Sequence, residues 1–359
     1  MELELVTTTG AFAGLKEEWN ALLARSSTRH IFLTHEWQYT WWEHFGSGDE
    51  GLLILLVRDQ GRLVGIAPLR RDRLTLKGLP ILRQLTFLIG YEADYRDLLL
   101  EEGKEWEVLG EMLTYLREQV QGWDLLALRG IRGSSPVKDL LPSVGGLQGL
   151  ACYGEIGVGC PFIPLPSTYA EFAQSLSGGV RREYGRKLRA LEKREGSFTL
   201  TAYQGDAMPP EAFEEFLRLH RLSWQGRGGT HALHSEKVVE FHRSLLERMR
   251  PTQTPIIMTL STNGQGVSVL YGYVQDGVFY DYLPGHDPAF QQYSPGIQMV
   301  LQAAEYCIEQ GWTELDLMRG EESYKFNFTR HVRHLHNHFV ARKPSTLRRA
   351  RIVEGLATR

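Results

Sequence analysis

Cysteine is scarce in this chain, which has three in 359 residues. They are Cys152, Cys160 and Cys307, an odd number with no spacing typical of a metal site. Small secreted proteins depend on many disulfides, so this scarcity predicts a protein of a reducing compartment. We therefore expect no structural disulfide and no metal centre.

Other features are missing as well. No apolar run approaches the roughly 20 residues of a membrane-spanning helix. The first residues, MELELVTTTGAF, lack the basic-then-apolar pattern of a signal peptide. We expect a cytoplasmic protein, with peripheral membrane contact left open. The chain has no Gly-x-Ser-x-Gly elbow and no obvious Cys–His arrangement, so a covalent serine or cysteine nucleophile is not indicated.

The composition itself is that of a well-packed globular protein, with 42% hydrophobic and 23% charged residues. Its length is enough for about two or three domains. The net charge of -3 conceals a mildly basic second half, in which the excess lies mainly in 181–194 and after Arg342. This local asymmetry is not the field of a DNA-binding protein, and we expect no DNA partner.

The hydrophobic patterns of the two halves follow the same order: helix, helix, antiparallel hairpin strands, helix, strand. No fixed-period sequence repeat accompanies this likeness. Turn signals such as Asp59-Gln60-Gly61, Asn263-Gly264 and Asp276-Gly277 mark the hairpins. The mixed order predicts an α/β (α+β mixed) fold. Prolines in CPFIPLPSTY suggest the linker, giving domains 1–165 and 166–345 and a basic tail, 346–359.

Several segments resemble a known family. FLTHEWQYTWWEHF, LVGIAPL and DYRDLLL lie in the first half; HRLSWQGRGG, YDYLPGHDPAFQQYSPG and LDLMRGEESYKFNF lie in the second. In order and spacing they resemble the tandem GNAT acetyltransferases of the CelD-like group, relatives of the Fem-type aminoacyl transferases. The resemblance implies two GNAT-like domains, each a mostly antiparallel sheet flanked by helices. It also implies an acyl-CoA donor, acetyl-CoA or a longer acyl-CoA, bound by the second domain.

The resemblance places the donor loop between the fourth strand and the next helix of that domain, at QQYSPG. Backbone N–H groups at a helix N-terminus favour a diphosphate, and small residues let it approach. Ser294 stands where the family usually has glycine, and Pro295 gives up one N–H. Taken alone, this stretch is an ordinary helix start. The predicted donor-binding residues are Gln291, Gln292, Tyr293, Ser294, Pro295 and Gly296.

Transfer of an acyl group to an amine needs a base, stabilisation of the thioester oxygen and an acid for the thiolate. Asp281 and His286 lie at the carboxyl end of the strand before the loop, although GHDP also reads as a turn. Asp316 alternates with leucines on the next strand, where it could face a site or pair with Arg319. The resemblance suggests Tyr324 as the acid. The alternative is that Tyr324 is simply a residue of an amphipathic helix.

Further residues could bind the acceptor or position the donor. Lys325 follows Tyr324, as in the tandem group, and Glu321 could hold an ammonium. Trp224 ends a helix and is equally a core residue. In the first half the YEADYRDLL segment could contact the acceptor across a cleft, or could be a polar loop. The predicted substrate-binding set is Asp94, Tyr95, Arg96, Trp224, Arg319, Glu321 and Lys325.

Two charged features have simpler readings. His334, His336 and His338 share one face of a strand, but no carboxylate or cysteine accompanies them, so we predict no metal there. The basic residues of 181–194 form a helix whose default interpretation is a solvated face. The alternative is contact with phosphate groups of a membrane, a lipid carrier or tRNA.

These observations favour an N-acyltransferase that moves an acyl group, with acetyl the default, from acyl-CoA to an amine. The amine could belong to a small metabolite, a sugar or polysaccharide precursor, or a lipid. A Fem-type aminoacyl transferase using aminoacyl-tRNA is the alternative, weakened because the long helical insertion of those enzymes is absent. A non-catalytic, degenerate GNAT pair is the third hypothesis.

Overall fold

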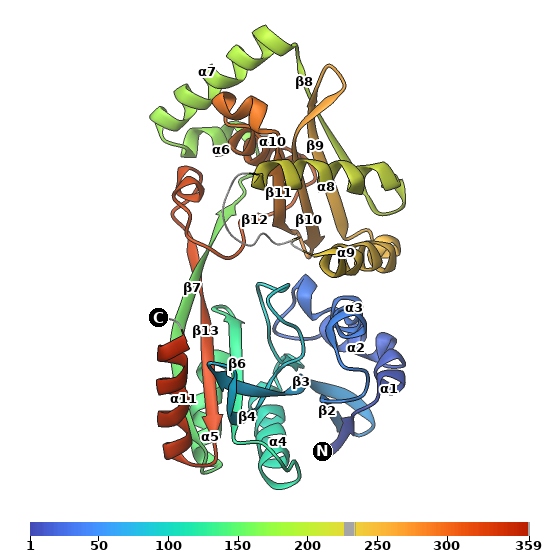
Figure 1. Ribbon diagram of the computed structural model, residues 1–359, viewed down its shortest axis with the longest axis vertical. Helices are drawn as coiled ribbons and strands as arrows, with labels where there is room; N and C mark the ends of the chain where they lie inside the picture. Colours follow the sequence, from blue (N-terminus) through green and yellow to red (C-terminus); the bar gives the residue numbers. More distant parts are fainter. Residues whose placement is uncertain (226–232, 234, 358–359) are drawn as a thin grey trace. The chain divides into compact units, whose positions relative to one another are not determined.

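The computed structural model describes residues 1–225, 233 and 235–357, which form two compact units (Figure 1). Unit 1 comprises Met1–Val158 and Arg333–Arg359, and unit 2 comprises Gly159–Val332. Each unit has its own sheet and its own hydrophobic core.

The sheet of unit 1 has the order β1-β2-β3-β4-β6-β13-β7. The pairs from β1 to β4 are antiparallel, β4 and β6 are parallel, and β13 returns antiparallel to β6. A short strand, β5, pairs with β3. The strands are β1 (Glu2–Val6), β2 (Leu52–Asp59), β3 (Arg62–Leu76), β4 (Leu79–Phe87), β5 (Leu99–Leu100), β6 (Leu125–Arg132), β7 (Ala151–Pro164) and β13 (Val332–Ala341).

Helices cover the sheet of unit 1 and complete its core. Valine, leucine and methionine side chains of α4 and α5 pack against the leucine-rich strands β2, β3 and β6, whereas α11 packs on β4, β6 and β13. The helices are α1 (Thr9–Ala13), α2 (Lys16–Leu23), α3 (His35–Phe45), α4 (Glu105–Glu118), α5 (Val137–Leu147) and α11 (Pro344–Ala357), with a 3₁₀ turn, η1 (Ile31–Leu33).

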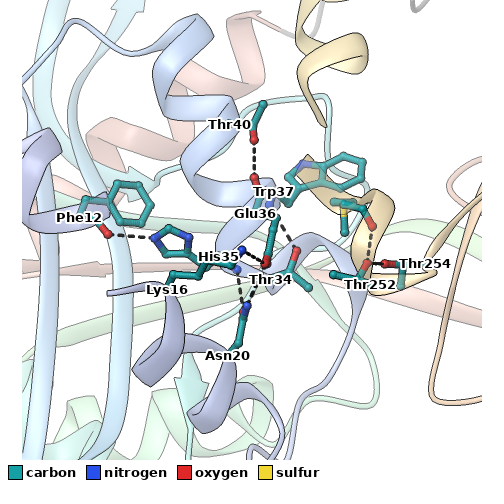
Figure 2. A network of polar contacts seen from close by, with 11 residues as sticks. Phe12, Lys16, Asn20, Thr34, His35, Glu36, Trp37, Thr40, Thr252 and Thr254 are labelled. Carbon is teal, nitrogen blue, oxygen red and sulfur yellow. Dashed lines mark hydrogen bonds and ion pairs between the residues drawn. The ribbon is translucent and has the colours of Figure 1, made fainter. Parts of the chain in front are cut away.

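A buried polar network joins α2 to α3 (Figure 2). Glu36 is 2% exposed, and its carboxylate accepts a hydrogen bond from Asn20 Nδ2 at 2.9 Å and pairs with Lys16 at 3.2 Å. Asn20 Oδ1 in turn accepts the N–H of His35 at 3.0 Å. Thr34 caps α3 by accepting the N–H of Trp37. The buried charge is thus paired and hydrogen-bonded, as a buried carboxylate requires.

The sheet of unit 2 has the order β7-β12-β11-β10-β9-β8. The three pairs from β8 to β11 are antiparallel, β11 and β12 are parallel, and the end of β7 is antiparallel to β12. The strands are β8 (Phe198–Gln204), β9 (Pro255–Thr262), β10 (Gln265–Gln275), β11 (Val278–His286) and β12 (Glu314–Asp316). The hairpin turns fall at Asn263-Gly264 and Asp276-Gly277, as predicted, all four residues having positive φ.

The helices of unit 2 include two, α6 and α7, that precede its first hairpin strand. Phe172 of α6 is buried in the core with Met299 and Ala303 of α10. The helices are α6 (Tyr169–Ser175), α7 (Gly178–Glu195), α8 (Pro210–Trp224), α9 (Glu236–Met249) and α10 (Pro295–Glu309), with 3₁₀ turns η2 (Gly205–Ala207), η3 (Arg250–Thr252), η4 (Pro288–Tyr293) and η5 (Ser323–Asn327). Within the described residues, no helix combines the length and apolar character needed to span a membrane.

The two sheets are built on one plan, as the repeated hydrophobic pattern predicts. Each has four strands in antiparallel succession, then one parallel pair, then one antiparallel partner for the last strand. The parallel pairs are β4–β6 in unit 1 and β11–β12 in unit 2.

Strands β7 and β13 run between the two units, so the units differ from the predicted domains 1–165 and 166–345. The CPFIPLP segment is not a linker, because Cys160–Pro164 belong to β7 and Phe162–Pro164 pair with β12. The prolines do not break this pairing, because Phe162 N–H donates to the His331 carbonyl and Leu165 N–H donates to the Thr313 carbonyl. Conversely β13 pairs with β6 in unit 1 rather than closing the second domain, and the predicted tail is helical up to Ala357, as part of α11 (Pro344–Ala357).

Candidate functional site

The two parallel strands of unit 2 part at their carboxyl ends. They are paired over three residues, Val278–Tyr280 with Glu314–Asp316. There β12 ends, whereas β11 continues to His286 without a described strand beside it on that side. Ligands of such sheets gather at the carboxyl ends of parallel strands, so this opening is the candidate site.

Strand β11 carries a β-bulge at the same level. Gly272 of β10 lies opposite Asp281, but the next residue back, Tyr271, lies opposite Leu283. Tyr282 is therefore the extra residue on β11. A bulge bends its strand and re-aims the neighbouring side chains, and bulges are frequent beside active sites.

Two carboxylates lie where the strands part. Asp281 is 7% exposed and Asp316 is 0% exposed. Burial raises the pKa of Asp281 to about 7, the Lys325 ammonium opposes this rise, and the charge of Asp316 adds to it. Asp281 therefore titrates near neutral pH, which is the range in which a general base works best.

Lys325 organises the turn after β12. It is 4% exposed, and its Nζ donates to the carbonyl oxygens of Met318, Arg319 and Gly320 at 3.3, 3.1 and 3.0 Å. It also pairs with the Glu322 carboxylate at 2.9 Å. The turn is tight, because Met318 has a φ of 61° and its N–H bonds back to Asp316 Oδ1 at 2.9 Å. Lys325 is thus a structural clamp on residues 318–322, and its charge also lowers the pKa of Asp281.

Tyr324 precedes this lysine and remains partly exposed, at 37%. Partial burial, followed by the negative charges of Asp281 and Glu322, raises its pKa above the usual value. The hydroxyl therefore keeps its proton at neutral pH and can donate it. Cys307 of α10 lies on the buried side, where burial and the charge of Asp281 raise the pKa of its thiol.

The segment 288–296 leads from β11 into α10. Gln291, Gln292 and Tyr293 belong to the 3₁₀ turn η4, in which Asp287 caps Ala289. Ser294 is left-handed, with φ 56° and ψ 58°, and its N–H bonds to the Gln291 carbonyl. The Ser294 carbonyl accepts the N–H groups of Ile297 and Gln298, and Pro295 has none. Among the described residues, Gly296 N–H is the amide of this helix start that has no hydrogen-bond partner.

Helix α7 lies against the loop, a contact that the sequence pattern did not indicate. Lys187 Nζ donates to Ser294 Oγ at 2.9 Å and pairs with Glu183 at 2.8 Å. Gln298 of α10 donates to the Tyr184 carbonyl at 2.9 Å, and Asn327 donates to the Tyr184 hydroxyl at 3.2 Å. In the sequence Lys187 is one of many basic residues, so nothing marks it as the one that faces inward.

A cavity of about 490 Å³ adjoins this cluster within unit 2. Apolar side chains of β7, α7 and the segment after Lys325 form one part of its wall, and Arg330 and His331 provide its basic groups. Asn327, which contacts Tyr184, is also in the wall. The cavity thus begins where the residues that follow Lys325 meet α7.

The sequence around this site matches a known protein-family model. The family profile described as the acetyltransferase (GNAT) domain covers residues 178–326. Residues 178–326 are thus similar to that family. The matched range includes α7, the parting strands, the segment 288–296 and Lys325. No protein of curated function matches the chain significantly.

Solved structures extend the fold beyond the GNAT domain to almost the whole chain. FemX is 12% identical, with a TM-score of 0.61, covering 95% of this chain and 97% of its own. L-PGS from Bacillus licheniformis is 13% identical, with a TM-score of 0.52 and coverage of 96% and 97%. The C-terminal domain of a putative lysylphosphatidylglycerol synthetase from Agrobacterium fabrum is 11% identical, with a TM-score of 0.56 and coverage of 97% and 96%. The predicted fold, with a mostly antiparallel sheet flanked by helices in each unit, is confirmed, and FemX shares it.

The remaining predicted residues of unit 2 have different positions and contacts. His286 is the last residue of β11 and pairs with Ser268. Glu321 accepts the N–H of Gly159 at 3.3 Å, and the carbonyl of Arg319 is held by Lys325. Trp224 is the half-buried end of α8. The segment after it, including Arg227 of the HRLSWQGRGG motif, lies outside the described residues.

In unit 1 the corresponding opening is filled by the chain itself. β4 and β6 are paired from Gln84 to Thr86, and residues 88–98 then run where the strands part. Arg96 forms a parallel bridge with Ile131, and its N–H bonds to the Gly130 carbonyl. Tyr95 is fully buried beneath the Arg132 guanidinium. Of the predicted substrate residues here, Tyr95 is thus a core residue, and Asp94 and Arg96 flank it.

The described part of the chain contains no group of three or more His, Cys, Asp or Glu side chains placed to hold a metal ion. His336 and His338 stack at 6.4 Å on β13, and burial lowers the pKa of His338 to about 4.

Proposed function

We propose that the chain is an N-acyltransferase whose donor is an acyl thioester of CoA and whose acceptor is an amine. The pantetheine arm would enter the opening between β11 and β12, and its diphosphate would lie at Gly296 N–H and Lys187. Beyond Tyr280, no described strand pairs with that edge of β11, so its backbone N–H groups could donate to the thioester oxygen as negative charge develops.

Asp281 would take a proton from the attacking amine, because its raised pKa suits a base at neutral pH. The amine nitrogen then forms a bond to the carbonyl carbon, and the carbon–sulfur bond breaks. Tyr324 would give its proton to the departing thiolate. Asp316 and Lys325 would tune Asp281 and hold the turn that carries Tyr324. No covalent enzyme intermediate is needed.

The single observation that supports this proposal most is the parting of a parallel strand pair beside a titratable buried carboxylate, inside a GNAT domain. The likeness to FemX favours a second candidate, transfer of an aminoacyl group from tRNA. The described residues of unit 2 contain no long helical hairpin, α7 being the longest helix at 18 residues. That insertion is typical of the Fem-type enzymes, so CoA remains the preferred donor.

Calorimetric titration with acetyl-CoA, longer acyl-CoAs and CoA tests the donor site. A Cβ added at Gly296 would meet nothing within 4 Å, so Gly296→Phe should fold normally while its ring covers the amide. Donor affinity should fall by about tenfold or more, the loss of a charge-assisted hydrogen bond. Gly146→Phe in α5, which is equally open, is the matched control. If no acyl-CoA binds the wild type, the proposal is wrong.

A further inference from the structure

Helix α7 presents a stripe of four cations on the face opposite the donor loop. Arg182, Arg186, Arg189 and Lys193 follow the i, i+4, i+7, i+11 spacing of one helix face, and all four are exposed. They span about 16 Å along the helix. None takes part in an ion pair among the described residues, since the nearby Glu183 pairs with Lys187 instead. Four like charges so close together repel one another, which makes an anionic partner favourable.

The other face of the same helix contacts the donor loop. Lys187 holds Ser294, and the Tyr184 carbonyl holds Gln298. Leu191, which is 0% exposed, packs with Phe290 and Tyr293 of the loop. A partner on the stripe is therefore separated from the loop by one helix diameter, about 10–12 Å. A long flexible thioester arm can cover that distance.

The chemistry of the stripe narrows the kind of partner. Helices that lie in a membrane surface insert an apolar face, but Val180 and Leu191 of α7 pack within unit 2. Its other leucine, Leu188, is half-buried. Proteins that bind single-stranded nucleic acid combine cations with exposed aromatic rings for stacking. The stripe has no aromatic residue, and Tyr184 lies on the inner, half-buried face. A compact acidic protein surface fits these features better.

We propose that the stripe is the docking surface for an acidic acyl carrier protein, which presents its acyl-pantetheine arm to the donor loop. This inference rests on the proposed use of a pantetheine thioester. Free CoA would use the loop and Lys187, whereas the carrier would use the same loop and the stripe as well.

The test measures binding of a fluorescently labelled acyl carrier protein, bearing its acyl-pantetheine arm, by anisotropy. The stripe variant carries Arg182→Gln, Arg186→Gln, Arg189→Gln and Lys193→Gln, since glutamine preserves helix propensity. The matched control carries Arg73→Gln, Lys77→Gln, Lys343→Gln and Arg348→Gln, exposed cations of unit 1 that form no ion pair in the described residues. Acyl-CoA titrations of both variants accompany the assay.

Carrier affinity should fall by about tenfold in the stripe variant, as expected for four exposed charge pairs, and should weaken with salt. The control should match the wild type, and acyl-CoA affinity should be unchanged in both. Equal carrier binding by the stripe variant and the control overturns the inference. So does stripe-dependent binding of anionic phospholipid vesicles or tRNA without carrier binding. Stripe-dependent carrier binding without any acyl-CoA binding would leave the inference intact and refute CoA as donor.

Discussion

Replacing Asp281 with Asn should stabilise the protein at neutral pH while it removes the proposed base. The folded-state pKa of Asp281, about 7, lies above its usual 3.8. The folded protein therefore binds this proton more tightly than the unfolded chain does. The stabilisation is fully present below about pH 3.8 and is lost as the pH rises through 7. Asn cannot ionise, so the variant escapes this loss.

Each pKa unit corresponds to about 1.4 kcal/mol, so the full effect is about 4 kcal/mol above pH 7. The unfolding free energy of Asp281→Asn minus that of the wild type should rise by about 3 kcal/mol between about pH 5 and pH 7.5. Urea denaturation at a series of pH values measures this difference. Asp97 of unit 1, whose pKa burial also raises to about 7, contributes equally to both proteins and cancels.

The exposed Asp206 of the same unit provides the control, because Asp206→Asn should leave the difference flat with pH. A flat difference for Asp281→Asn would refute the reasoning, since it would mean that the carboxylate is well solvated. Transfer activity should nevertheless fall sharply in that variant. Greater stability together with lower activity is expected of a site that holds a buried charge for catalysis.

Three further predictions concern single side chains. Tyr324→Phe should lower kcat by about 10²-fold or more and leave donor affinity unchanged, as measured by steady-state kinetics beside calorimetry. Lys325→Met removes the ammonium that lowers the pKa of Asp281, so the acidic limb of the pH–rate profile should move to higher pH. Burial and the Arg132 charge hold the pKa of His30 well below its usual 6.5. The contribution of His30 to the wild-type unfolding free energy should therefore fall by up to about 1.4 kcal/mol per pH unit below about pH 6.5. In urea denaturation the unfolding free energy of His30→Leu minus that of the wild type should rise as the pH falls, because Asp281 and Asp97 act equally on both proteins.

The local elements of the fold follow from the sequence because their signals are local. Alternating apolar residues and tight turns such as Asn263-Gly264 specify hairpins over a few residues. Strand β7 was misread because Pro161 and Pro164 are turn signals, and only the pairing with β12 shows that they lie in a strand. Helix α5 was missed because Pro142 interrupts its pattern. The partner of β13 leaves no local trace, since it lies about 200 residues earlier in the chain.

The sequence predicted those candidate-site residues that lie at or just after the ends of predicted strands. Asp281, Asp316, Tyr324 and Lys325 stand at strand ends or beyond them, and the structure brings them together. The role of Lys325 as a clamp on three carbonyls depends on the path of the turn, which no spacing reveals. Lys187 could not be predicted either. Several basic residues of α7 are alike in sequence, and packing decides which of them faces the loop.

The pairing of β13, near the end of the chain, with β6 of unit 1 has a consequence for synthesis on the ribosome. The sheet of unit 1 contains β13. Its inner strand β6 can pair with β4 early, but it lacks its second neighbour until the last part of the chain has emerged. The sheet of unit 2 needs only β7, which has already been made. We therefore expect unit 2 to reach its native state first, and a fragment of residues 1–165 to show weak amide protection in hydrogen exchange. Full native protection in that fragment would contradict this. Unit 1, whose synthesis begins first, can complete its sheet only when β13, the last strand of the chain, has been made.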